Sequence, residues 1–131
     1  MESKIRRHFD EIVTVAQSLL NNIKIEEDLS EKRSLLKISG TFEAREVKIT
    51  EIIDEEKRKY AYYLINQGVV EYGCDNAPDL KALKMKYGKD YKKHLNEPTP
   101  HSHDKGKKNI DLTEEMNVKE FLEKIRFLSS F

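Results

Sequence analysis

The stretch KYAYYLINQGVVEYGCD, residues 59–75, decides the fold because it holds two β-strand patterns joined by a tight turn. Aromatic and β-branched residues dominate residues 59–66 and again residues 69–75, which is typical of strands. The two residues between them, Gln67 and Gly68, leave room for a hairpin turn but not for a crossover helix. The pattern therefore predicts two adjacent antiparallel strands.

Three further strand patterns precede this hairpin, at residues 23–29, 33–42 and 45–54. In the second of them, Leu36 and Phe42 fall on one face and polar residues fall on the other, so one face should be buried and one exposed to water. Each pattern is separated from the next by only a few residues. Connections that short predict an antiparallel meander of four to five strands.

Helices are predicted at both ends of the chain. Apolar residues recur near the N-terminus at the 3.6-residue period of an amphipathic helix: Ile5, Phe9, Ile12, Val13, Ala16, Leu19 and Leu20. A second helix should begin at Asn117, which can cap it while Glu120 stands at the capping-box position. We predict one α+β domain over residues 1–131, with an N-terminal helix, the meander, a basic helical and loop excursion, and a C-terminal helix.

The excursion covers residues 79–110 and concentrates the positive charge of the chain. Residues 79–108 hold nine lysines against four acidic residues, a balance of +5, whereas the formal net charge of the whole chain is zero. Residues 80–95 predict a lysine-rich helix weakened at Gly88, and residues 96–110, with two prolines, predict a loop. A neutral protein with such a segment can present one basic surface to a polyanion.

His101 and His103 stand in this predicted loop, directly before Lys105, Lys107 and Lys108. In an extended segment, side chains two residues apart point the same way, so both imidazoles can address one target. An imidazole accepts or donates a proton near neutral pH, and lysines can hold phosphate oxygens. The two histidines are therefore the candidate catalytic residues, as base and acid, and the three lysines are candidate substrate-binding residues.

Two alternatives to this interpretation stay open. The loop can be a flexible polar segment without chemistry. It can also bind a metal, but a tetrahedral site wants three or four ligands, and only His94, Asp104 and Cys74 are available to complete one, at no recognised spacing. Cys74 lies in an apolar strand, where a buried thiol is the simpler interpretation. We therefore expect no metal and no cofactor.

Three other residues are candidates for contact with a substrate. Asp75 and Asn76, just before Pro78, can shape a site or orient a histidine, and the alternative is a turn in which their side chains bond the backbone. Tyr62 belongs to a strand whose tyrosines must cover both faces. A tyrosine on an open sheet can stack on an unpaired base, and core packing is the alternative.

The composition excludes several other classes of protein. The sequence has no Walker phosphate loop, no Gly-x-Gly-x-x-Gly turn and no Gly-x-Ser-x-Gly elbow. It has one cysteine, no apolar run long enough to cross a bilayer and no signal-peptide pattern after Met1, so we expect a cytoplasmic protein without membrane contact. Charged residues make up 37% of the chain, a proportion that fits a thermophile.

Taken together, these pieces resemble the TumE family of prokaryotic toxin components. The resemblance covers roughly residues 33–128, and its most specific part is the strand end CDNAP followed by the proline-histidine loop TPHSHDKG. In this chain the lysine-rich residues 79–97 are inserted between these two motifs. The resemblance implies a small α+β toxin of a type II toxin-antitoxin system, encoded beside a helix-turn-helix antitoxin that neutralises it.

The resulting hypothesis is a growth-inhibiting, metal-independent endoribonuclease whose partners are RNA, the antitoxin and a possible second copy of the chain. The alternative is a non-catalytic RNA-binding or partner-binding module with the same basic surface. RNA supplies its own 2′-hydroxyl nucleophile, so a ribonuclease needs little beyond proton transfer and phosphate binding. The two hypotheses differ in whether RNA affinity survives replacement of both histidines.

Overall fold

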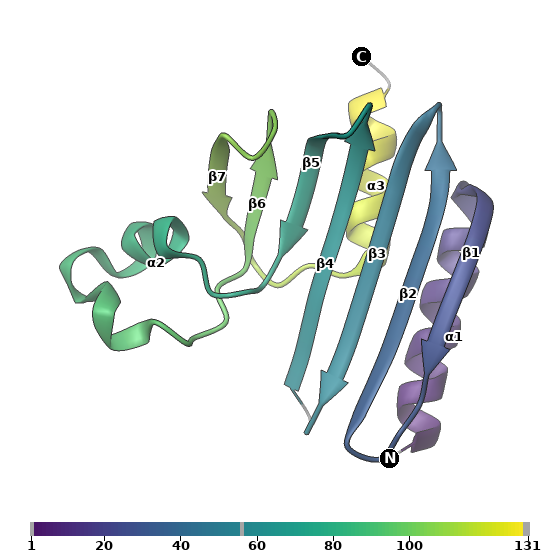
Figure 1. Cartoon of the computed structure of the whole chain (residues 1–131), viewed down its shortest axis with the longest axis horizontal. Helices are drawn as coiled ribbons and strands as arrows, with labels where there is room; N and C mark the ends of the chain where they lie inside the picture. Colours follow the sequence, from purple (N-terminus) through teal and green to yellow (C-terminus); the bar gives the residue numbers. More distant parts are fainter. Residues whose placement is uncertain (1, 56, 130–131) are drawn as a thin grey trace.

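A computed structural model describes residues 2–55 and 57–129 (Figure 1). The first helix leads into five strands: α1 (Glu2–Leu19), β1 (Asn21–Asp28), β2 (Arg33–Phe42), β3 (Arg45–Asp54), β4 (Lys57–Asn66) and β5 (Val69–Asp75). The rest of the chain forms α2 (Leu80–Tyr87), the 3₁₀ helix η1 (Gly88–His94), β6 (His101–Asp104), β7 (Asn109–Leu112) and α3 (Val118–Ser129). Among the described helices, none has the length and apolar character that a membrane span requires.

The described strands form one antiparallel sheet of seven, in the order of the sequence from β1 to β7. The α+β class and the meander are confirmed, with more strands than the four to five predicted. The prediction of a loop over residues 96–110 was wrong, because residues 101–104 pair with β5 and residues 109–112 pair with β6. The open edge of β5 supplies hydrogen-bonding partners for β6, and β6 supplies them for β7.

Helices α1 and α3 cover the same face of the sheet, as Figure 1 shows. Both helices are amphipathic, and their apolar stripes face the sheet and pack on its strands. The core they enclose includes Phe9, Ile12, Ala16, Leu36, Ile38, Val47, Ile49, Tyr60, Tyr62, Leu64, Cys74, Phe121 and Ile125. The other face of the sheet is left without these two helices.

Several local predictions are confirmed. Gln67 and Gly68 have φ angles of 52° and 81°, both in the left-handed region that a two-residue hairpin turn requires. Gly88 ends α2 with a φ of 58°. The capping box of α3 is present: the Glu120 N–H donates to Oδ1 of Asn117 at 2.8 Å, and the Asn117 N–H donates to Oε1 of Glu120 at 3.2 Å.

Strand register decides which side chains of β4, β5 and β6 share a face. Tyr62 pairs with Cys74, and both belong to the core under the helices. The neighbouring row joins Ala61, Asp75 and His101 across the three strands, so side-chain alternation places it on the opposite face. The next row on that face joins Tyr63, Gly73 and His103. The face without α1 and α3 therefore carries the candidate residues.

Candidate functional site

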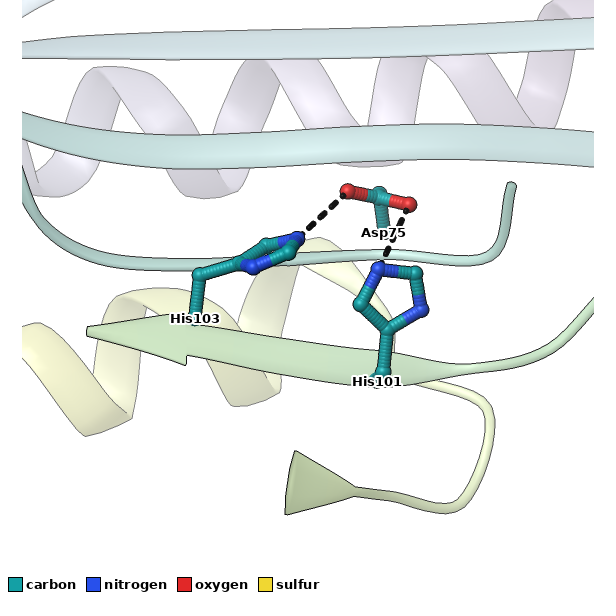
Figure 2. A group of neighbouring side chains, drawn as sticks. All are labelled: Asp75, His101 and His103. Atoms are coloured by element: carbon teal, nitrogen blue, oxygen red, sulfur yellow. Dashed lines mark ion pairs between the residues drawn. The ribbon is translucent and has the colours of Figure 1, made fainter. Parts of the chain in front are cut away.

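Three side chains meet where β5 ends and β6 begins: Asp75, His101 and His103 (Figure 2). We call them the Asp–His cluster. Asp75 pairs with His101 in the sheet, and His103 points to the same face two residues further along β6. The Nε2 atom of His101 lies 3.3 Å from Oδ1 of Asp75, and Nε2 of His103 lies 3.4 Å from Oδ2. One carboxylate therefore contacts both imidazole rings.

Two donors fix the carboxylate of Asp75. The Tyr63 hydroxyl donates to Oδ2 at 2.6 Å, and the backbone N–H of Ala77 donates to Oδ1 at 3.0 Å. The Tyr63 ring reaches across β5 because residue 73 is glycine, where a Cβ would lie 2.2 Å from Cδ1 of Tyr63. Each oxygen of Asp75 thus accepts a hydrogen bond from a group other than the two imidazoles.

His101 is held by the backbone of Thr99. Its Nδ1 lies 2.6 Å from the Thr99 carbonyl oxygen, and since a carbonyl oxygen only accepts, Nδ1 carries the proton. The Thr99 N–H donates to the Asn76 carbonyl at 3.0 Å. The Asn76 side chain bonds β4: it accepts from the Tyr60 N–H at 3.0 Å and donates to the Arg58 carbonyl at 2.8 Å. Asn76 therefore bonds the backbone and positions His101 through Thr99.

The Asp–His cluster is almost closed to water. His101 is 1% exposed, His103 is 6% exposed and Asp75 is 7% exposed. The two imidazole rings meet edge to face at 4.7 Å between centroids. Burial lowers the pKa of His103, the neighbouring His101 and Lys107 lower it further, and Asp75 opposes them. Within the described part of the chain, Nδ1 of His103 has no hydrogen-bond partner.

The three candidate lysines lie on the turn between β6 and β7. Lys105, Lys107 and Lys108 are exposed, and the Gly106 N–H anchors the turn by donating to the Val70 carbonyl at 2.8 Å. The ammonium of Lys107 lies 4.8 Å from the ring centroid of Tyr63, which also contacts Asp75. A polyanion bound by this basic turn would therefore lie next to the Asp–His cluster.

Tyr62 does not join these residues. Its ring is fully buried on the helix-covered face, where it packs against Phe121 at 5.5 Å between centroids. The expectation that Tyr62 contacts a substrate was wrong, because the register places Tyr63 on the face of the Asp–His cluster instead. Cys74 also lies under the helices, as a buried thiol whose pKa burial raises to about 12, so it cannot complete a metal site with the histidines.

A second buried polar group bonds the sheet to Met116, in the segment directly before α3. Glu51 has no exposed surface, and Arg58 donates to both of its oxygens, at 2.8 Å and 3.0 Å. The Tyr62 hydroxyl also donates to Glu51, and Arg58 donates to the Met116 carbonyl at 2.8 Å. Tyr62 is therefore a structural residue.

Sequence reasoning missed Tyr63, Gly73 and Thr99 as parts of the site. Gly73 gave a signal, because a glycine inside a strand often marks a close approach of another group. The choice between Tyr62 and Tyr63 needed the register of β4 and β5, which the sequence does not state. Thr99 contributes backbone groups, and because every residue has a carbonyl, the residue type at position 99 gave no signal.

No protein-family model, curated protein or solved structure matches this chain. The resemblance to TumE toxins therefore stays a prediction.

Proposed function

We propose that the chain is a cytoplasmic toxin of a toxin-antitoxin system and that it inhibits growth by cleaving RNA. The observation that supports this most directly is the position of the Asp–His cluster beside three exposed lysines. Cleavage of RNA requires proton transfer at the 2′-hydroxyl and positive charge near the phosphate. The cluster offers the first and the basic turn offers the second.

The proposed reaction divides these roles between the two histidines. Nε2 of His103 takes the proton of the 2′-hydroxyl, O2′ attacks phosphorus, and the bond from phosphorus to O5′ breaks. A protonated His101 gives its Nε2 proton to O5′. The products are a 2′,3′-cyclic phosphate and a 5′-hydroxyl. His103 is assigned as the base because burial lowers its pKa, which leaves the neutral ring available, and because it lies nearer Tyr63 and the lysines.

The roles proposed for His101 and His103 require both rings to change their contacts. Both Nε2 atoms face Asp75, and His101 is 1% exposed. Proton exchange with RNA therefore requires each ring in turn to trade its contact with Asp75 for a contact with the substrate. Lys107 lies over the Tyr63 ring, whose hydroxyl bonds Asp75, so the proposed route of the substrate runs past these two residues.

A non-catalytic RNA-binding module is the second candidate function, and the same burial favours it. Exposed lysines can bind phosphates while the buried cluster serves to hold β6 on β5. This candidate predicts that RNA affinity is kept when both histidines are replaced. The antitoxin, implied by the resemblance alone, is the proposed protein partner in either case.

The experiment is cleavage of total cellular RNA by the purified protein, with and without a chelator, followed by analysis of the new ends. Discrete cleavage that is lost in His101→Ala and in His103→Ala supports the proposal, and cyclic phosphate ends support the assigned roles. His94→Ala is the matched control, because His94 lies on η1 and contacts Glu97 rather than Asp75. Absence of cleavage by folded natural protein would favour the binding module.

A further inference from the structure

The Asp–His cluster has the composition of a metal site. One ligand atom from each of Asp75, His101 and His103 lies within 4.8 Å of the other two, and all three side chains are buried. Burial of three groups that can each carry charge is costly unless they are paired or bind a cation. The cluster therefore needs a positive charge, either as protons or as a metal ion.

The hydrogen bonds of His101 indicate where that charge belongs. Since Nδ1 donates its proton to the Thr99 carbonyl, the neutral ring presents a lone pair at Nε2. That lone pair lies 3.3 Å from Oδ1 of Asp75, which is also an acceptor. Two acceptors facing each other in a buried place repel unless a proton or a cation lies between them.

The separations favour a cation over a shared proton. A charge-assisted N–H···O bond spans about 2.7–2.9 Å, shorter than either separation here. In a tetrahedral site with metal–ligand distances of about 2.0–2.1 Å, neighbouring ligand atoms lie about 3.3–3.4 Å apart. Nε2 of His101 lies 3.3 Å from Oδ1 of Asp75 and Nε2 of His103 lies 3.4 Å from Oδ2, so each nitrogen has this spacing to its own carboxylate oxygen. The remaining separations between ligand atoms, no longer than 4.8 Å, would shorten as the side chains close on the ion.

The surroundings are also those of a metal site. Metal-binding histidines commonly donate the other ring N–H to a carbonyl, as His101 does to Thr99. Metal-binding carboxylates are held by outer hydrogen bonds, as Asp75 is by Tyr63 and Ala77. These partners orient the ligand atoms of two of the three residues before any ion binds.

We propose that Asp75, His101 and His103 bind one divalent transition-metal ion, with at least one coordination position left for water or a phosphate oxygen. Two imidazoles and one carboxylate suit zinc, iron or manganese, whereas magnesium and calcium prefer oxygen ligands alone. Lys107 lies beside Tyr63, whose hydroxyl bonds Asp75, so the basic turn is next to the proposed site. A phosphate group of the substrate thus fits the remaining position.

This inference changes the roles assigned above without depending on RNA cleavage. A histidine that binds a metal through Nε2 has no lone pair left for proton transfer. The expectation of metal-independent chemistry and the metal site thus exclude each other, and metal content distinguishes them directly.

The test uses protein purified without a metal-affinity tag, stripped with chelator and then equilibrated separately with Zn²⁺, Mn²⁺, and Fe²⁺ without oxygen. After gel filtration, elemental analysis should find about one ion per chain for at least one metal. Asp75→Asn and His101→Gln keep side-chain size, and each should weaken binding by more than about 100-fold, the upper end of what loss of an outer partner costs. His94→Gln should bind as the natural protein does.

Cobalt gives a second readout that does not depend on activity. Co²⁺ at the site should give visible absorption bands that Asp75→Asn lacks, and Zn²⁺ should raise the unfolding temperature of the natural protein. If the stripped natural protein retains no more of any metal than Asp75→Asn does, the inference is overturned. Metal binding without RNA cleavage supports the inference and removes the proposed function. Cleavage by metal-free natural protein that also retains no more metal than Asp75→Asn does the reverse.

Discussion

The ring of Tyr63 lies directly over Gly73, and this contact lets the Tyr63 hydroxyl reach Asp75 at 2.6 Å. A Cβ at position 73 would lie 2.2 Å from Cδ1 of the ring and 3.1 Å from the Tyr62 carbonyl oxygen. The missing side chain at position 73 is therefore as much a part of the site as the tyrosine that occupies its space.

Gly73→Ala should displace Tyr63 and break its hydrogen bond to Asp75. Overpacking of this kind costs about 1–3 kcal/mol of unfolding free energy, which urea denaturation measures. Tyr63→Phe removes only the hydroxyl, and we expect metal affinity to fall about 10- to 100-fold with little loss of stability. Tyr91→Phe on η1 is the control. Unchanged metal affinity in both Gly73→Ala and Tyr63→Phe would contradict a role for Tyr63 in orienting Asp75.

Asn76→Ala should destabilise the fold and disturb the cluster at the same time. The side chain makes two buried hydrogen bonds to β4, and their loss leaves a buried N–H and a buried carbonyl without a partner, at about 1–3 kcal/mol each. Exposed Asn96 provides the control, because Asn96→Ala should change stability by less than about 0.5 kcal/mol. Equal stability of the two variants would show that the junction between β5 and α2 is held in another way.

Arg58→Met should be strongly destabilising because it leaves the carboxylate of Glu51 buried without its partner. Removing one member of a buried ion pair costs about 3–5 kcal/mol. The nearby Lys59→Met on the exposed side of β4 is the matched control. The double variant Glu51→Leu with Arg58→Met should recover part of the loss, since it removes both charges. A double variant less stable than Arg58→Met alone would contradict this account.

Tyr60 provides a test at high pH. Burial raises its pKa to about 12, although the Met116 N–H that donates to its hydroxyl opposes this, and its ring is buried. In the unfolded chain a tyrosine ionises near pH 10. The neutral form is thus favoured by folding, so its contribution to stability is complete below pH 10 and is lost as the pH rises through 12. Urea denaturation between pH 9 and 11 should show this fall, and Tyr60→Phe should make it shallower.

If RNA binds to the basic turn as proposed, its affinity should depend on salt. Each lysine that contacts a phosphate of single-stranded RNA contributes about 0.7 to the slope of log affinity against log salt concentration. Replacing Lys105, Lys107 and Lys108 by Gln should reduce the slope by about 2. The matched control replaces exposed lysines on β1 to β3: Lys24, Lys37 and Lys48. A slope that responds only to the control set would place RNA on that other surface.

Periodicity predicted most of the fold, because α1, α3 and the strands β2 to β5 carry apolar residues at the spacing of their own structure. It did not predict β6, where the inward-facing residues are His101 and His103. A buried histidine looks polar in the sequence, so alternation between buried and exposed positions was invisible there. The pairing of β6 with β5 is also made across a helical excursion, and long-range pairing leaves no local pattern.

The candidate site was likewise predicted only in part from the sequence. The sequence singled out Asp75, His101 and His103 by residue type and spacing, and the structure brings them together. It could not choose between Tyr62 and Tyr63, because a shift of one residue in register exchanges the two faces of β4. The sequence also did not show that the cluster is buried. Burial is what makes Asp75, His101 and His103 a candidate metal site.

The long segment between Asp75 and His101 has a consequence for the timing of synthesis. Closing this segment costs chain entropy before the β5–β6 pairing repays it, whereas the strands from β1 to β5 pair between neighbours along the chain. A ribosome that has released β5 has therefore produced a sheet with a carboxylate at its edge and no imidazole beside it. The Asp–His cluster is complete only after β6 has been synthesised and has paired with β5.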